Sequence, residues 1–168
     1  MGNTVSISGI GLHTGNTSIL TFKPAPPNSG VRFKRTDLND CPEILADIDH
    51  VIDIARGTTI GQNGAIIHTV EHVLAAIAGL EIDNILVEID TNEPPVIDGS
   101  ALPFAQILVK AGFEEQDTIK DYLVIEETIT YSDQERGVDI VVVPSDTFRI
   151  VFMVDYRNPA LGTQYTSL

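Results

Sequence analysis

Cysteine and basic residues are scarce in this sequence of 168 residues, and tryptophan is absent. The single cysteine, Cys41, has no intrachain partner for a disulfide, which is typical of a protein from a reducing compartment. Only 10 Lys and Arg stand against 24 Asp and Glu, so the net charge of -14 repels the phosphates of nucleic acids and of anionic membranes. Neither nucleic acid nor a membrane surface is expected as a partner.

Long apolar runs are also missing. None approaches the ~18–20 residues of a membrane-spanning helix, so no transmembrane segment is expected. The N-terminal sequence MGNTVSISG has neither the basic region nor the apolar region of a signal peptide. We therefore expect a cytoplasmic protein. Its hydrophobic fraction of 43% indicates a globular chain with one sizeable core or two small ones.

Strand patterns and helix patterns are mixed in residues 1–120. Apolar and polar residues alternate in the expected strands, whereas apolar residues keep helical spacing in the expected helices. The expected strands are residues 18–22, 31–34 and 85–89, and the expected helices are residues 70–80 and 102–111. We further expect the first two strands to be antiparallel neighbours, Thr69 to cap the first helix, and Gly79 and Gly112 to end the helices.

The sequence changes character near residue 120. Strand patterns follow at residues 122–131, 138–143 and 148–156, with no helix pattern after them. We expect an antiparallel meander, which would expose one face if nothing covered it. The predicted fold is α+β, with a two-layer domain of sheet and helices at residues 1–120 and the antiparallel start of a second, similar but truncated domain at residues 121–168. We expect the native chain to continue.

Histidine occurs at four positions, and only His68 and His72 lie close together, in the run HTVEH. The literal pattern H-x-x-E-H is that of inverted zincins, in which two histidines of one helix bind zinc and the glutamate acts as base. That mechanism requires both histidines on one helix face. The expected helix starts only at Thr69, which leaves His68 in the connection before it.

Glu71 and His72 can act together as base and metal ligand without His68. Consecutive helix residues diverge by ~100°, so His72 can bind a metal while Glu71 reaches a metal-bound water from the side. The helix N-terminus favours an ionised carboxylate, as a base requires. The alternative is that Glu71 only complements the charge of the helix N-terminus and that His72 is a surface or core histidine.

The run TVEHVLAAIAGLEIDN at residues 69–84 resembles the signature helix and following strand of the UDP-3-O-acyl-N-acetylglucosamine deacetylase family. Further segments agree in order: GIGLHTG at residues 9–15, RTDL at 35–38 and PVIDGSA at 95–101. The resemblance covers essentially the whole sequence. Its motifs are specific to that family rather than shared by zinc hydrolases in general.

The resemblance implies zinc-dependent hydrolysis of the N-acetyl group of UDP-3-O-acyl-N-acetylglucosamine, a UDP-sugar lipid, in lipid A biosynthesis. Family members have two α+β domains with the active site between them. By position, Glu71 would be the general base and His72 a zinc ligand. The other ligands belong to an H-x-x-x-D motif that this sequence lacks. We therefore expect the missing C-terminal half as a partner, and weak or absent zinc binding and no activity for this chain alone.

The resemblance also implies substrate contacts outside the HTVEH run. His13, in a glycine-rich loop, would approach the active-site cleft. Thr58 belongs to a loop beside the acetyl group, where Arg56-Gly57 replaces the hydrophobic residue and cysteine that are common in the family. Asp155 and Tyr156 match a segment whose aromatic ring stacks on the uracil, and the flat face of a tyrosine suits that contact.

Some alternatives stay open at this point. Asp98 either accepts a hydrogen bond that orients the zinc histidine or forms a turn before Gly99. The protein could also be an inverted-zincin metallopeptidase that uses His68 and His72, or a non-enzymatic α+β interaction module. The position of His68 relative to the helix tests the first of these rivals, and zinc titration separates both from the deacetylase.

Overall fold

In a computed structural model that describes residues 1–168, alternating apolar and polar residues form a five-stranded mixed sheet. The strand order is β1 (Val5–Ile10), β2 (Thr17–Pro24), β8 (Ile85–Ile89), β3 (Val31–Arg35) and β4 (Glu43–Leu45). β3 is parallel to β8, and every other neighbouring pair is antiparallel. The prediction that β2 and β3 are direct neighbours was wrong, because β8 lies between them and pairs with both.

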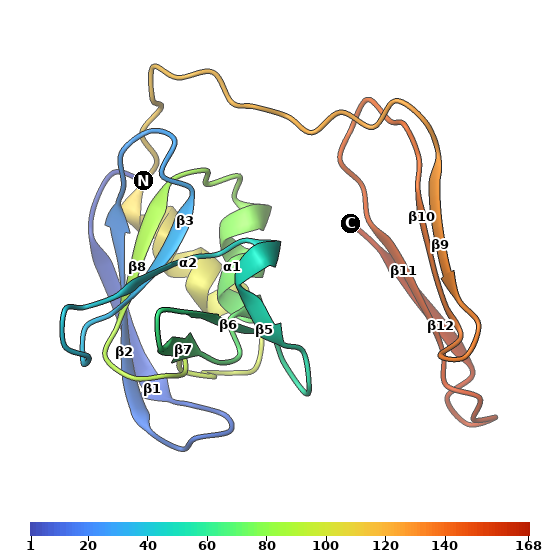
Figure 1. Ribbon diagram of the computed structural model, residues 1–168, viewed down its shortest axis with the longest axis horizontal. Coiled ribbons are helices and arrows are strands. Elements are labelled where there is room, and N and C mark those ends of the chain that lie inside the picture. Colours follow the sequence, from blue (N-terminus) through green and yellow to red (C-terminus); the bar gives the residue numbers. More distant parts are fainter. The chain divides into compact units, whose positions relative to one another are not determined.

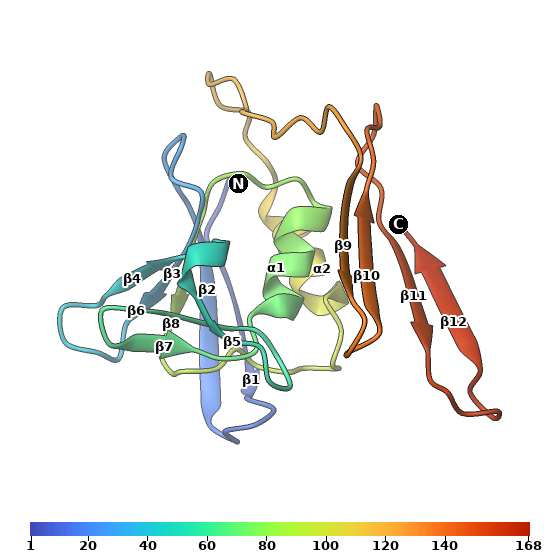
Figure 2. The same ribbon diagram turned by 45° about the vertical axis from the view of Figure 1, so that its right-hand side comes forward.

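Two helices, α1 (Glu71–Gly79) and α2 (Leu102–Ala111), lie side by side against one face of this sheet (Figure 1 and Figure 2). Each buries a stripe of residues three or four positions apart, as an amphipathic helix does. The stripes are Val73, Ala76 and Ile77 on α1 and Phe104, Leu108 and Ala111 on α2. They join the inward-facing residues of the sheet, such as Phe22, Phe33 and Val87, in one apolar core. This core fixes where α1 begins relative to the sheet.

The ends of the helices agree only in part with the sequence prediction. α2 ends before Gly112, whose φ is 76°, as predicted. α1 is capped by Val70, which makes no side-chain hydrogen bond, so the predicted cap at Thr69 was wrong. The left-handed residue after α1 is Glu81, with φ 54°, and not Gly79. Neither helix combines the length and apolar character needed to span a bilayer.

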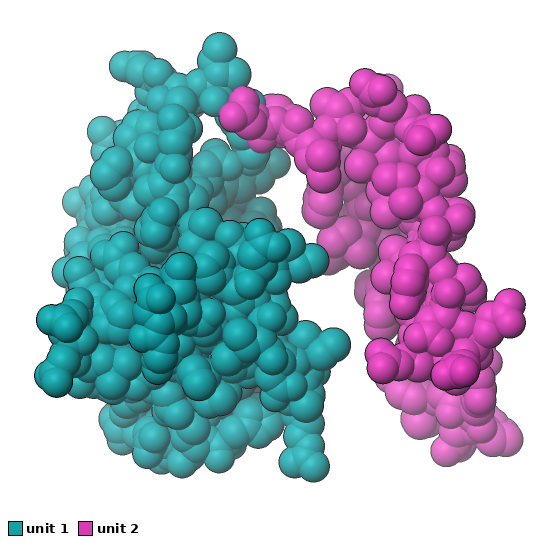
Figure 3. All heavy atoms as spheres, viewed as in Figure 1, with its two compact units in different colours: residues 1–120 teal, residues 121–168 magenta.

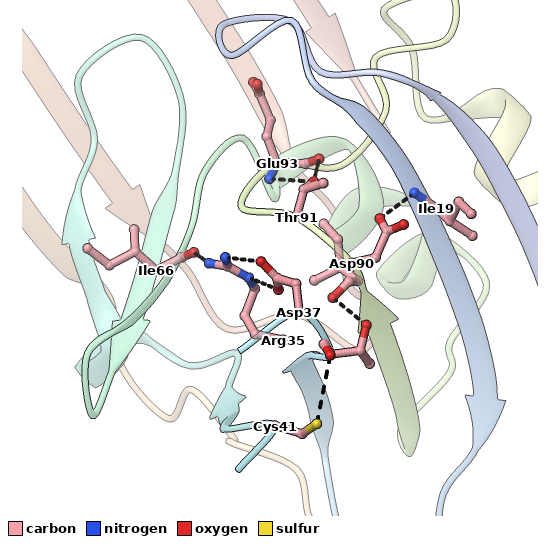
Figure 4. Close-up of polar contacts among 10 residues, drawn as sticks. Ile19, Arg35, Asp37, Cys41, Ile66, Asp90, Thr91 and Glu93 are labelled. Atoms are coloured by element: carbon pink, nitrogen blue, oxygen red, sulfur yellow. Dashed lines mark hydrogen bonds and ion pairs between the residues drawn. The ribbon is translucent and has the colours of Figure 1, made fainter. Parts of the chain in front are cut away.

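A small antiparallel sheet of β5 (Val51–Asp53), β6 (Thr59–Gln62) and β7 (Ala65–Ile67) follows a 3-10 turn at Ile48–His50. Arg35 at the end of β3 ties this sheet to the main one (Figure 4). Its guanidinium donates to the Ile66 carbonyl at 2.6 Å and makes two hydrogen bonds to Asp37, at 2.8 and 2.7 Å. The side-chain hydrogen bond from Arg35 lowers the pKa of Asp37. The small sheet is thereby anchored where its strands lead into α1.

The chain divides into two compact units, Met1–Lys120 and Asp121–Leu168 (Figure 3). The second unit consists of two hairpins, β9 (Ile129–Asp133) with β10 (Val138–Val142) and β11 (Val151–Asp155) with β12 (Thr163–Ser167). The predicted meander was wrong, because β10 and β11 belong to separate sheets. The strands expected at residues 122–131 and 148–156 are shorter than predicted. The fold class, α+β with a mixed sheet layered against helices, is confirmed.

Candidate functional site

Glu71 and His72 are the first two residues of α1. Both are half-buried, whereas the next residue, Val73, is in the core. Their predicted position at the N-terminal end of a helix is confirmed, and neither is enclosed in the hydrophobic core. A side chain at this place can meet a ligand while its backbone is held by the helix.

The backbone of Thr58, in the loop before β6, holds the start of α1 on two sides. The Thr58 N–H donates to Oε2 of Glu71 at 2.9 Å, and the Thr58 carbonyl accepts from the Val70 N–H at 3.1 Å. A Cβ added to the neighbouring Gly57 would lie only 3.2 Å from Oε1 of Glu71. The Thr58 N–H thus orients the carboxylate through Oε2, while Oε1 makes no hydrogen bond within the chain.

The ring of His72 makes no hydrogen bond or ion pair within the chain, so both ring nitrogens are available to a ligand. No group of three or more His, Cys, Asp or Glu side chains is arranged to hold a metal ion. A catalytic zinc site ordinarily takes three protein ligands and a water. The residues present therefore fit one ligand position of such a site, that of His72.

His68 does not share the helix of His72. Its backbone N–H donates to the Asn92 carbonyl at 2.8 Å, and its Nδ1 lies 3.1 Å from Oγ1 of Thr59. The next residue, Thr69, has φ 54°, and this left-handed conformation separates His68 from the start of α1. A two-histidine zinc site on one helix face is therefore contradicted, and with it the inverted-zincin interpretation.

Glu93 is a buried carboxylate in the loop after β8, directly before Pro94 and Pro95. It follows Thr91, with which it shares a local hydrogen bond (Figure 4), and it has no exposed surface. Its carboxylate accepts the backbone N–H and the hydroxyl of Thr14, both at 2.8 Å, and the backbone N–H of His13 at 3.1 Å. The hydroxyl of Thr69 donates to the other oxygen at 2.8 Å. One carboxylate thus joins the His13 loop to the residue before the α1 cap.

Hydrogen bonds keep the Glu93 carboxylate charged in spite of its burial. Burial alone raises its pKa, but the donors of Thr14, His13 and Thr69 together hold that pKa below the ordinary value. Gly11 permits the close approach, because a Cβ there would lie 2.6 Å from both Oε2 of Glu93 and Oγ1 of Thr14. The loop of residues 11–14 is therefore shaped around a buried negative charge.

Replacing Glu93 by glutamine is expected to lower the free energy of unfolding by about 2–3 kcal/mol at pH 7, the scale of hydrogen bonds to a charged group. Because the folded-state pKa of Glu93 lies below the ordinary value of 4.5, the charged network adds stability above that pH. This added stability is lost as the pH falls through the folded-state pKa. The difference in the free energy of unfolding between Glu93→Gln and the wild type should therefore shrink in acid. Chemical denaturation between pH 7 and pH 3.5 measures it.

The matched control for this series is Glu115→Gln, which removes a carboxylate that is exposed in the same unit. It should unfold like the wild type over the whole pH range, because the Glu115 side chain is exposed and loses no buried hydrogen bond when it is replaced. Equal stability of Glu93→Gln and wild type at pH 7 would show that the buried network is not stabilising.

A pocket of about 260 Å³ opens beside the start of α1. His13, Gly57, His68 and Thr69 contribute to its wall, with Arg56 as its one permanent cation. The predicted substrate-contacting residue His13 therefore lies at a cavity, whereas Thr58 is not part of the wall and contacts the helix through its backbone. Neither Glu71 nor His72 belongs to the wall, although the wall includes Gly57, whose added Cβ would lie 3.2 Å from Oε1 of Glu71, and Thr69, two residues before Glu71.

Of the remaining predicted site residues, Asp98 lies in a turn, Asp155 is the last residue of β11 and Tyr156 follows it. Both side-chain hydrogen bonds of Asp98 come from Ser100, from its N–H at 2.9 Å and its hydroxyl at 2.8 Å, and none joins Asp98 to His72. The side-chain hydrogen bond from Ser100 lowers the pKa of Asp98. In the second unit, Asp155 accepts the Arg157 N–H at 3.0 Å, and Tyr156 follows β11 with 49% of its surface exposed. The tyrosine ring is accessible to a stacking partner.

Comparison with known proteins extends these observations. Residues 1–168 match the family described as UDP-3-O-acyl N-acetylglycosamine deacetylase (LpxC). The chain is 58% identical over 166 residues to a Chlorobaculum tepidum protein named bifunctional enzyme LpxC/FabZ, a match that covers 99% of this chain and 36% of that protein.

Two further relatives are named UDP-3-O-acyl-N-acetylglucosamine deacetylase. The chain is 42% identical over 160 residues to the protein of Haemophilus influenzae, covering 95% of this chain and 52% of that protein. It is 41% identical over 159 residues to the protein of Myxococcus xanthus, covering 95% of this chain and 50% of that protein. The chain thus spans about half the length of these two curated relatives.

Proposed function

Since this chain belongs to the UDP-3-O-acyl N-acetylglycosamine deacetylase family, we propose that it is the part of a zinc-dependent deacetylase that carries the general base and one metal ligand. The substrate would be a UDP-3-O-acyl-N-acetylglucosamine, whose N-acetyl group is hydrolysed in lipid A biosynthesis in the cytoplasm. The observation that carries the proposal is the pair Glu71 and His72, half-buried at the start of α1, which begins two residues after Thr69 of the pocket wall.

In this proposal His72 would hold the zinc through one ring nitrogen, with further protein ligands from residues outside 1–168. When bound, zinc polarises the acetamide carbonyl and lowers the pKa of a coordinated water. Glu71 would accept the proton of the attacking water at Oε1, the oxygen without a hydrogen bond in the chain. The Thr58 N–H at Oε2 would keep that carboxylate in place, and the N-terminus of α1 favours its negative charge.

Other residues of the chain would bind the substrate. His13 and Arg56 line the pocket, where Arg56 can attract an anionic group of the nucleotide sugar against the overall negative charge of the chain. Tyr156 presents an accessible ring on which a uracil could stack, with Asp155 beside it. These contacts favour a nucleotide-linked sugar over a peptide substrate.

The proposal is tested by assaying acetate release from UDP-3-O-acyl-N-acetylglucosamine. The full-length protein, loaded with zinc, is expected to release acetate. A chelator that removes the metal should abolish this activity, because the water is then no longer bound to zinc and its pKa is no longer lowered. The 168-residue chain alone is expected to release none. No release by the zinc-loaded full-length protein, or full activity of the chain alone, would contradict the proposal.

A further inference from the structure

The start of α1 carries both proposed catalytic groups, yet no capping side chain defines it. A helix N-terminus leaves backbone N–H groups without partners inside the helix, and a capping side chain usually binds one of them and fixes the first turn. Val70, the cap residue here, is apolar and makes no such bond. Other contacts must therefore hold Glu71 and His72 in place.

Besides the two backbone hydrogen bonds of Thr58, contacts come from the segment just before the helix. Thr69 has a left-handed backbone, which a β-branched residue rarely adopts and which costs ~1–3 kcal/mol unless its surroundings enforce it. Its hydroxyl donates to Oε1 of Glu93 at 2.8 Å, in a site where Thr69 is 7% exposed. The preceding His68 is held to Asn92 of the same turn. The turn at residues 91–93 is thus hydrogen-bonded to both residues that lead into α1, His68 and Thr69.

The other oxygen of Glu93 holds a segment about 80 residues earlier in the sequence. Thr14 donates both its N–H and its hydroxyl to Oε2, and the His13 N–H is shared between Oε2 and Oε1, at 3.1 Å from each. Gly11 has no Cβ where one would meet the carboxylate. Since His13 and Thr69 both line the pocket, one buried carboxylate connects two parts of the same wall.

We propose that Glu93 is a positioning residue of the deacetylase, which acts through Thr69 to fix the first turn of α1 and through His13 and Thr14 to fix the facing pocket loop. This inference rests on the proposed function for its catalytic consequence. In this role Glu93 itself would touch neither substrate nor metal. Its effect is to hold the Glu71 carboxylate and the His72 ring where the reaction needs them.

The sharpest test uses two substitutions at Thr69 in the full-length, zinc-loaded enzyme. Thr69→Val keeps the β-branched shape and the backbone strain but removes the donor to Glu93, whereas Thr69→Ser keeps the donor. For Thr69→Val we expect kcat to fall by about 10–100-fold with KM unchanged, the cost of a small misplacement of reacting groups. Thr69→Ser should recover most of that rate. Rates are expressed per folded, zinc-containing site, so a simple loss of folded protein does not lower them.

Ile44→Val is the control for lost stability, because Ile44 is fully buried in β4, a strand that contributes no residue to the pocket wall or to the hydrogen bonds of Glu93. It should lower the melting temperature without changing kcat per folded site. A wild-type kcat in Thr69→Val, or the same loss in Thr69→Ser, would overturn the positioning role.

Hydrogen exchange of the same full-length proteins separates this inference from the proposed function. In Thr69→Val and in Glu93→Gln, amides of residues 68–75 should exchange faster, and in Glu93→Gln those of residues 9–16 should as well. Ile44→Val should leave both segments unchanged. Faster exchange confined to residues 9–16 in Glu93→Gln would refute the coupling to α1, whatever the activity. If the wild type does not deacetylate the substrate, the proposed function is refuted. The exchange rates still show whether Glu93 is coupled to the first turn of α1.

Discussion

Replacing Glu71 by glutamine in the full-length protein is expected to lower kcat by about 10²–10⁴, the scale of losing a general base. The amide has nearly the size of the carboxylate, and its oxygen can still accept the Thr58 N–H, so the start of α1 should keep its shape. It cannot accept the proton of the attacking water. Zinc content should stay near that of the wild type, because Glu71 is not a ligand in this proposal.

Zinc content by atomic absorption and acetate release, measured on the same preparation, check this prediction. Glu81→Gln is a matched control, because Glu81 is exposed beyond the other end of α1. It should leave both quantities unchanged. A Glu71→Gln enzyme with wild-type kcat would remove Glu71 from the mechanism, and one that loses its zinc would make Glu71 a ligand instead.

Replacing His72 by alanine is expected to abolish zinc binding and activity together. The ring of His72 has no structural partner in the chain, so its loss should barely affect the fold, while a three-ligand site reduced to two holds zinc poorly. The melting temperature of the metal-free protein should therefore match that of metal-free wild type. His50→Ala is the control, because His50 is paired with Asp47 through Nδ1 in the 3-10 turn and should retain zinc and rate.

The position of Glu71 and His72 could be predicted because it is encoded locally. Helical spacing of apolar residues and the run HTVEH occur within a few residues of one another, and α1 starts within one residue of the prediction. The same holds for β8 and α2, whose bounds agree with the periodic pattern. Short segments that carry their own periodicity need no knowledge of distant parts of the chain.

Features that depend on distant contacts could not be predicted in this way. Glu93 meets His13 across 80 positions of sequence, and no local pattern distinguishes a buried network carboxylate from a turn residue beside two prolines. The insertion of β8 between β2 and β3 is likewise a long-range pairing. The capping role predicted for Thr69 failed because a local preference was overridden by the bond of its hydroxyl to Glu93.

Burial explains the remaining differences. The hairpins of residues 121–168 have few buried side chains, so hydrophobic alternation alone does not define where their strands end. In β2 and β8, by contrast, every second residue is in the core, and the register is set by which face must be buried. Sequence prediction was most accurate where a segment contributes to the core of residues 1–120.

The most direct test of the account is to measure bound zinc and acetate release side by side for the full-length wild type, Glu71→Gln and His72→Ala. The account predicts zinc and activity in the wild type, zinc without appreciable activity in Glu71→Gln, and neither in His72→Ala. This pattern assigns base and ligand to adjacent residues of one helix. Full zinc and full rate in His72→Ala would contradict the central claim, because the pair at the start of α1 would then have no part in the metal site.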